Sequence, residues 1–139
     1  MDVLLVDDHP IIHETMRAIV RSVRTDVAFH GQFDLAGGLA QAGRLSDLGL
    51  VLVDLGLPGC SEMEALLKFR EAFPDTPVAV ISATEDAERV LAALDAGAAG
   101  YLPKTLLPKA MASALRAIID GQVYSPLAAG SEASAASRR

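Results

Sequence analysis

Short apolar runs that alternate with amphipathic segments most restrict the fold of this chain. Four runs, apolar at nearly every position and rich in Val and Leu, lie at residues 3–6, 50–53, 78–81 and 100–102. Continuous apolarity over so few residues is typical of strands buried on both faces of a sheet. A fifth run at 27–33 alternates apolar and polar residues over part of its length, which favours the sheet edge.

Helical periodicity fills the segments between the runs. It is clearest at residues 11–23, 63–73, 90–94 and 111–119. Pro10 suits the first turn of a helix, and Gly97 and Gly121 fall where helices need a left-handed exit. Three glycines weaken the segment 34–48, because each costs about 1 kcal/mol relative to Ala in a helix. We expect that helix to be short or frayed.

The five strand-helix alternations carry no hairpin signals, so they predict a parallel sheet with right-handed crossovers on both faces. This is a doubly wound α/β domain, and 139 residues are enough for one such domain. The pattern stops after Gly121, where small and polar residues follow. We therefore expect a folded domain over residues 1–122 and a flexible linker or tail over 123–139.

Charge and composition exclude several classes of protein. The chain has 12 Lys and Arg against 18 Asp and Glu, a net charge of -6 that disfavours a large nucleic-acid interface. Cys60 is the only cysteine, which points to a reducing compartment. No apolar run approaches the roughly 18 residues of a membrane span, and the first residues lack a basic signal-peptide region. We expect a cytoplasmic protein without membrane contact.

Polar residues follow four of the expected strands. Asp7 and Asp8 follow the first, and Asp54, Ser82 and Lys104 follow three others. Ligands of open parallel sheets bind at the carboxyl ends of the strands. Clustered carboxylates call for a cation, and their oxygens suit Mg²⁺, whereas an ammonium group and a hydroxyl suit a phosphoryl group. The set predicts a phosphoryl-transfer site with Mg²⁺ and Asp54 as nucleophile.

Each residue taken alone has a structural explanation. An Asp after a strand is often a helix cap, Ser82 could belong to a turn before a helix capped by Thr84, and a single Lys is usually solvated. Only their joint place at one sheet edge favours the site. His9 and His13 flank the acids, but Mg²⁺ prefers oxygen and no third imidazole or thiol accompanies them, so we expect neither to bind metal.

Four segments together resemble a known family. They are Val6-Asp7-Asp8-His9-Pro10, Val53-Asp54-Leu55-Gly56-Leu57-Pro58-Gly59, Ile81-Ser82-Ala83 and Gly97-Ala98-Ala99-Gly100-Tyr101-Leu102-Pro103-Lys104. Over residues 2–122 the chain resembles the receiver domain of two-component response regulators, most closely the NarL/LuxR subfamily. The resemblance implies a five-stranded, flavodoxin-like sheet of strand order 2-1-3-4-5.

The resemblance also implies roles for individual residues at a Mg²⁺ site. Asp54 would be the phosphoacceptor and a metal ligand, Asp8 a direct ligand, Asp7 a ligand mainly through water, and Gly56 a ligand through its backbone carbonyl.

Three further residues match the family's phosphoryl contacts and switch. Ser82 and Lys104 would contact the phosphoryl group, and Tyr101 matches the switch aromatic that turns inward when Ser82 moves. Two positions depart from the family pattern: Glu62 stands where Gly is common, and Gly56 replaces a bulkier residue.

The implied partners are a histidine kinase that supplies the phosphoryl group and a second copy of the chain after phosphorylation. Control of transcription would pass through a DNA-binding helix-turn-helix domain outside these residues. The resemblance implies that the chain is not an enzyme: it would only phosphorylate itself and slowly dephosphorylate itself at Asp54. Two alternatives are a receiver-like interaction module that works without phosphorylation and an Asp-nucleophile phosphatase. The phosphatase is disfavoured because Gly56 stands where it needs a second Asp.

Overall fold

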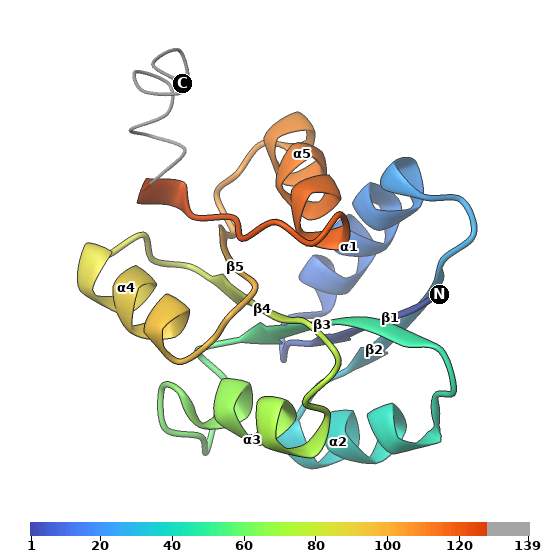
Figure 1. The fold of residues 1–139 in the computed structure, drawn as a ribbon, viewed down its shortest axis with the longest axis horizontal. Coiled ribbons are helices and arrows are strands. Elements are labelled where there is room, and N and C mark those ends of the chain that lie inside the picture. The colour runs from blue at the N-terminus through green and yellow to red at the C-terminus, as the bar shows by residue number, and fades with distance from the viewer. Residues whose placement is uncertain (128–139) are drawn as a thin grey trace.

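The computed structural model describes residues 1–127, which form a five-stranded parallel sheet between two layers of helices (Figure 1). The strands are β1 (Asp2–Val6), β2 (Ala28–Gln32), β3 (Leu48–Asp54), β4 (Val78–Ser82) and β5 (Gly100–Pro103). Their order, β2-β1-β3-β4-β5, confirms the doubly wound topology and the edge position of the second strand. After β2 the chain crosses over β1 and adds β3 on its other side. The strand order therefore reverses between β1 and β3.

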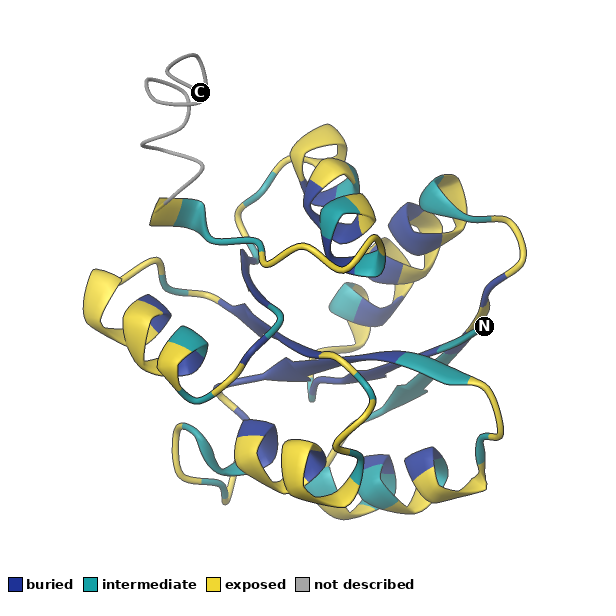
Figure 2. Ribbon diagram, viewed as in Figure 1, coloured by how far each residue is buried: buried dark blue, intermediate teal, exposed yellow. Residues whose placement is uncertain are grey.

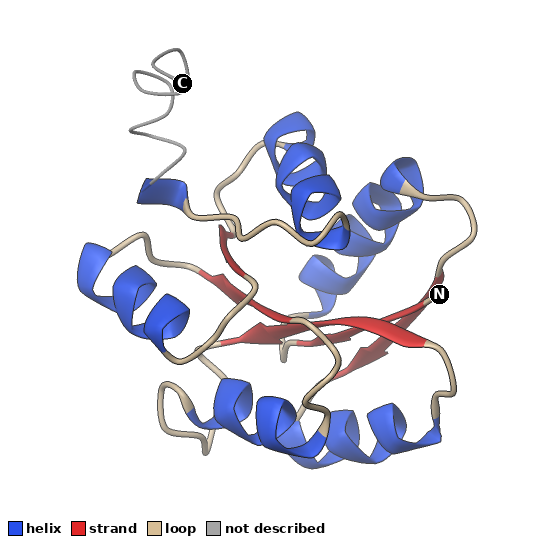
Figure 3. Ribbon diagram, in the orientation of Figure 1, coloured by secondary structure: helices blue, strands red, loops and turns tan. Residues whose placement is uncertain are grey.

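Helices cover both faces of the sheet (Figure 3). They are α1 (Pro10–Val23), α2 (Leu35–Arg44), α3 (Glu64–Ala72), α4 (Ala87–Asp95) and α5 (Pro108–Ile119). Val3 and Leu5 face the core under α1 and α5, whereas Leu4 and Val6 face the core under α2, α3 and α4. Figure 2 shows the buried residues on the sheet and on the helix faces turned toward it. Burial on both faces explains why the central strands β1, β3 and β4 are apolar at nearly every position, unlike the edge strand β2.

Helix α2 corrects one expectation from the sequence. It is a regular ten-residue helix, neither short nor frayed, and the Asp34 carboxylate caps it by accepting a hydrogen bond from the Gly37 N–H at 2.6 Å. Gly38 lets the helix approach the sheet, since a Cβ there would stand 2.6 Å from Val6 Cγ2 and 3.2 Å from Phe69 Cζ. Close packing outweighs the low helix propensity of glycine here.

Three other helix boundaries agree with the sequence prediction. Pro10 is the first residue of α1. Gly97 and Gly121 follow α4 and α5 with φ of 96° and 88°, in the left-handed region that favours glycine. These two glycines turn the chain back toward β5 and toward the segment after α5.

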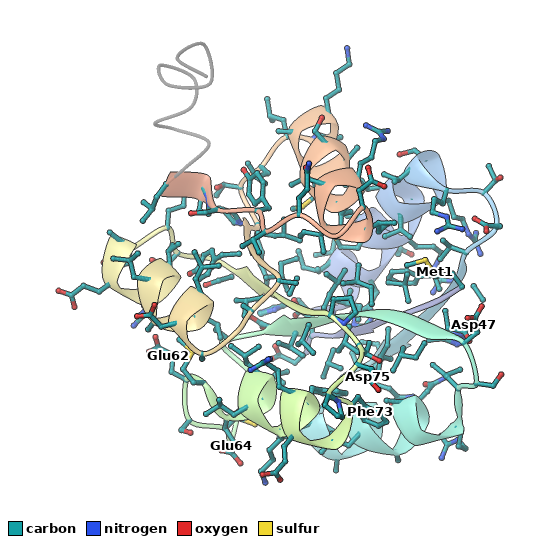
Figure 4. All side chains as sticks on the ribbon, viewed as in Figure 1. Met1, Asp47, Glu62, Glu64, Phe73 and Asp75 are labelled. Atoms are coloured by element: carbon teal, nitrogen blue, oxygen red, sulfur yellow. The ribbon has the colours of Figure 1, made fainter. Side chains whose placement is uncertain are left out.

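The carboxyl ends of the strands share one edge of the sheet. Asp54 is opposite Ile81 in β4, and Ser82 is opposite Pro103 in β5. The amino ends close the opposite edge, where the Met1 amino group lies 2.8 Å from Asp47 Oδ2 (Figure 4).

The segment after α5 begins against the sheet. Tyr124 pairs in parallel with Gly100, donates a hydrogen bond to the Ala99 carbonyl at 3.3 Å and accepts one from the Tyr101 N–H at 3.0 Å. Its side chain packs on the core beneath α1 and α5. The start of the predicted tail therefore covers the edge of β5, while residues 128–139 of that tail lie outside the described residues. In residues 1–127 no helix is long and apolar enough to cross a bilayer.

Candidate functional site

Five of the predicted site residues meet at the carboxyl edge of the sheet. Asp7 and Asp8 follow β1, Asp54 ends β3, Ser82 ends β4 and Lys104 follows β5. A pocket of about 460 Å³ opens here, lined in part by Asp54, Ser82 and Lys104. Because the strands are parallel, residues far apart in sequence reach one edge without any special loop.

The Lys104 ammonium group lies between two buried carboxylates. Its Nζ is 2.9 Å from Asp7 Oδ2 and 3.3 Å from Asp54 Oδ2. The Lys104 backbone N–H donates to the Ser82 carbonyl at 2.7 Å, which fixes the start of the lysine side chain. Since the three charged side chains are largely buried, solvent screens their attraction less than it would at the surface.

His9 belongs to the same cluster, although the sequence led us to expect no metal-binding role for it. Its Nδ1 lies 2.8 Å from Asp7 Oδ1, 3.3 Å from Asp8 Oδ1 and 3.2 Å from Lys104 Nζ. One ring nitrogen can donate to a carboxylate or accept from an ammonium group, but it cannot do both at once. The available signal was the position of His9 directly after the two acids. His13, by contrast, turns away from the pocket.

Within residues 1–127, three buried carboxylate oxygens accept no hydrogen bond: Asp7 Oδ2, Asp8 Oδ1 and Asp54 Oδ2. Lys104 supplies charge near the first and third, without the geometry of a hydrogen bond. One ligand atom from each of Asp7, Asp8, His9 and Asp54 lies within 4.8 Å of the others. One ammonium group cannot offset three carboxylates, and buried negative charge that is not offset is costly. The cluster therefore fits a divalent cation that prefers oxygen ligands.

Asp54 is buried, and burial raises the pKa of its carboxyl group. The charge of Asp7 acts in the same direction, whereas Lys104 and the Gly56 N–H, which donates to Asp54 Oδ1 at 3.0 Å, oppose it. Gly56 places no side chain beside the carboxylate, where a Cβ would stand 3.6 Å from Asp54 Oδ1. Asp54 is thus held by the Gly56 N–H and lines the pocket while remaining largely buried.

Ser82 and Tyr101 are joined through Thr84. The Ser82 hydroxyl accepts a hydrogen bond from the Thr84 N–H at 3.2 Å, and the Tyr101 hydroxyl donates to the Thr84 carbonyl at 2.7 Å. The Tyr101 ring points inward and is fully buried, and this burial raises the pKa of its phenol. A displacement of Ser82 would therefore reach Tyr101 through a single residue.

The pocket lining includes Glu62, one of the two departures noted in the sequence, and Cys60. Glu62 forms an ion pair with Arg89 at 3.1 Å, between the loop after β3 and helix α4, and Figure 4 shows Glu62 on the α4 side. Cys60 is a free, half-buried thiol in the same loop. Burial raises the pKa of Cys60, so the inert form of the thiol is favoured.

Comparison with known proteins decides the family. Residues 3–116 match the response regulator receiver domain. The chain belongs to this family. A receiver domain is a signalling domain and generally not an enzyme.

Relatives of this receiver domain include longer regulators. The glycerol metabolism activator of Pseudomonas putida is 32% identical over 89% of this chain and 56% of that protein. The nitrate/nitrite response regulator protein NarL of Escherichia coli is 31% identical over 87% of this chain and 56% of that protein. The receiver domain thus spans about half the length of the curated relatives it matches.

A solved structure agrees. The two-component response regulator of the LuxR family from an Aurantimonas species shares 28% identity and a TM-score of 0.81, over 93% of this chain and 92% of that chain. Together with the curated relatives, it confirms the predicted resemblance to NarL/LuxR response regulators.

Proposed function

We propose that Asp54 accepts a phosphoryl group in the presence of Mg²⁺ and that the phosphorylated receiver domain controls an output. The observation that carries the proposal is the cluster of carboxylates beside Lys104, in which one buried oxygen each of Asp7, Asp8 and Asp54 accepts no hydrogen bond. Asp8 and Asp54 would bind the ion directly, with Asp7 acting mainly through water. The Gly56 backbone carbonyl would complete the protein ligands. Bound Mg²⁺ would neutralise charge on the phosphoryl oxygens during transfer.

The transfer uses the open Asp54 carboxylate. A phospho-imidazole of a partner histidine kinase supplies the phosphoryl group: an Asp54 oxygen forms the bond to phosphorus as the bond to the imidazole nitrogen breaks. Lys104 then pairs with a phosphoryl oxygen, and the Ser82 hydroxyl turns from Thr84 to donate to another. Slow attack by water on the same phosphorus returns Asp54 to its starting state.

The added charge of about -2 then biases the conformation of the receiver domain. Movement of Ser82 releases the Thr84 N–H, and Thr84 holds the Tyr101 hydroxyl, so the loop after β4 and Tyr101 respond together. This change would favour pairing with a second copy of the chain. By analogy with the longer relatives, the output would be transcription through a DNA-binding domain outside the described residues.

Labelling with radioactive acetyl phosphate and Mg²⁺ tests the proposal. Asp54→Asn should lose hydroxylamine-sensitive label entirely. Asp75→Asn should label like the original chain, because Asp75 is exposed in the turn between α3 and β4 (Figure 4). Label that persists in Asp54→Asn would refute the assignment. No label in the unaltered chain would favour a phosphorylation-independent module, and steady turnover of a phosphomonoester would favour a phosphatase.

A further inference from the structure

His13 is a buried polar residue whose side chain stands outside the phosphoacceptor pocket. It lies in the second turn of α1 with 6% of its surface exposed. Its Nε2–H donates a hydrogen bond to the backbone carbonyl of Asp7 at 2.7 Å. A carbonyl only accepts hydrogen bonds, so this contact fixes which ring nitrogen carries the proton. His13 thus contacts the backbone of the acidic cluster rather than its side chains.

Two neighbours make room for the ring and cover it. Gly31 in β2 faces the imidazole: a Cβ there would stand 2.8 Å from His13 Cε1 and would also overlap Nδ1. Phe33 stacks against the ring with centroids 4.5 Å apart and planes tilted by 36°. Phe33 is 52% exposed, and this contact accounts for an apolar ring left at the surface. The His13 ring of α1 therefore lies between Gly31 in β2 and Phe33 in the loop that follows β2.

The carbonyl that His13 binds belongs to the peptide group joining Asp7 to Asp8. The N–H of Asp7 is also held, since it donates to the Gln32 carbonyl at 3.1 Å. The backbone of Asp7 is thus tied on both sides, to β2 through its N–H and to α1 through its carbonyl. With this peptide fixed, the backbone positions from which the Asp7 and Asp8 side chains reach the cluster are fixed as well.

We infer that His13 is a positioning residue for the divalent cation, acting through the Asp7 carbonyl to hold both acids in their binding geometry. This inference rests on the proposed function, because it assumes that the acids bind Mg²⁺. A role in packing alone would leave the hydrogen bond without consequence for the metal. A positioning role makes metal affinity depend on a donor at the place of Nε2.

Two substitutions separate these roles. His13→Gln keeps an N–H within reach of the Asp7 carbonyl, whereas His13→Met fills similar space without a donor. A typical buried hydrogen bond corresponds to about a fivefold change in an equilibrium constant. We expect His13→Met to raise the Kd for Mg²⁺ about fivefold in isothermal titration calorimetry, and His13→Gln to stay within about twofold of the unaltered chain. Glu14→Ala, exposed on the same turn, is the matched control.

A second measurement needs no metal. The His9 N–H donates to Asp7 Oδ1 at 2.9 Å, so its hydrogen exchange reports whether Asp7 keeps its place. In EDTA this exchange should be about fivefold faster in His13→Met and unchanged in Glu14→Ala. If His13→Met fails to fold, Gly31→Ala replaces it, because the added methyl group would displace the His13 ring. Gly31→Ala should then raise both the Kd for Mg²⁺ and the exchange rate of the His9 N–H.

The outcomes distinguish the inference from the function it rests on. Saturable Mg²⁺ binding that Asp8→Asn abolishes supports the metal site, and its absence from the unaltered chain overturns the proposed function. If the unaltered chain binds Mg²⁺ and His13→Met binds it equally well, only the positioning role is overturned. Equal losses of affinity in His13→Met and His13→Gln overturn it too, because the hydrogen-bond donor would then not matter.

Discussion

Asp54 combines burial with a negative charge and has few groups to offset that charge. Lys104 lies 3.3 Å from one of its oxygens, and the Gly56 N–H donates to the other. Asp7 adds a second negative charge nearby. The net effect is a raised pKa, so the ionised form of Asp54 lowers the stability of the fold in the absence of a cation.

Asp54→Asn should therefore stabilise the chain at neutral pH in EDTA. The sign follows from linkage: a carboxyl group whose folded pKa exceeds its unfolded pKa loses stability as pH rises from the unfolded value through the folded value. The stabilisation should be largest above the folded pKa and should shrink as pH falls below the unfolded pKa of about 3.9, where Asp54 becomes protonated in both states. Urea unfolding at several pH values measures it. Equal stability of the two chains at pH 7 would contradict the raised pKa.

The sequence predicted the acids, Ser82 and Lys104 at one edge because each directly follows a strand, and strand ends are readable from apolar runs. It did not predict that His9 lies among them. The His9 ring is placed by contacts with Asp7 and with Lys104, 95 residues further along the chain. The His13 bond to a backbone carbonyl was equally hidden, because it depends on space left by Gly31 in another strand.

Helix α2 shows how packing between elements overrides local preference. Glycine at position 38 is unfavourable for an isolated helix, yet it allows the helix to lie against Val6 in β1 and Phe69 in α3. Gly43 in the same helix has no atom near the place of its missing Cβ. Gly38 is therefore required by close packing, whereas Gly43 only lowers the stability of the helix.

Alanine at these two positions should change stability in opposite directions. Gly38→Ala should lower the free energy of unfolding by about 1–3 kcal/mol, the usual cost of overpacking a buried contact. Gly43→Ala should raise it by about 0.5–1 kcal/mol through helix propensity alone. Chemical denaturation of both variants measures the difference. A stabilised Gly38→Ala would mean that α2 can move away from the sheet at little cost.

The pocket with its clustered carboxylates lies at one edge of the sheet, beside the two apolar cores. The cores bury apolar side chains on both faces of the sheet, and the unpaired carboxylate oxygens lie where the sheet ends. Such a molecule can tolerate the charge cluster because its stability comes from elsewhere. Binding a cation should therefore stabilise the entire domain.

Mg²⁺ at about 100 times its Kd should add about 2.7 kcal/mol to the free energy of unfolding. For a domain of this size that corresponds to a rise in Tm of about 10 °C. Differential scanning calorimetry with Mg²⁺ and with EDTA measures the rise. Asp8→Asn should lose most of it and Asp75→Asn should keep it. A rise that survives in Asp8→Asn would place the cation elsewhere.

The pairing of Tyr124 with Gly100 changes the reach of whatever follows the domain. A free chain starting after Gln122 would gain roughly 17 Å of extended length from the five residues up to Leu127. With Tyr124 held against β5, this stretch instead stays beside the strand that carries Tyr101. A module attached beyond it would search a smaller volume, so its effective concentration near β5 and α4 would be higher.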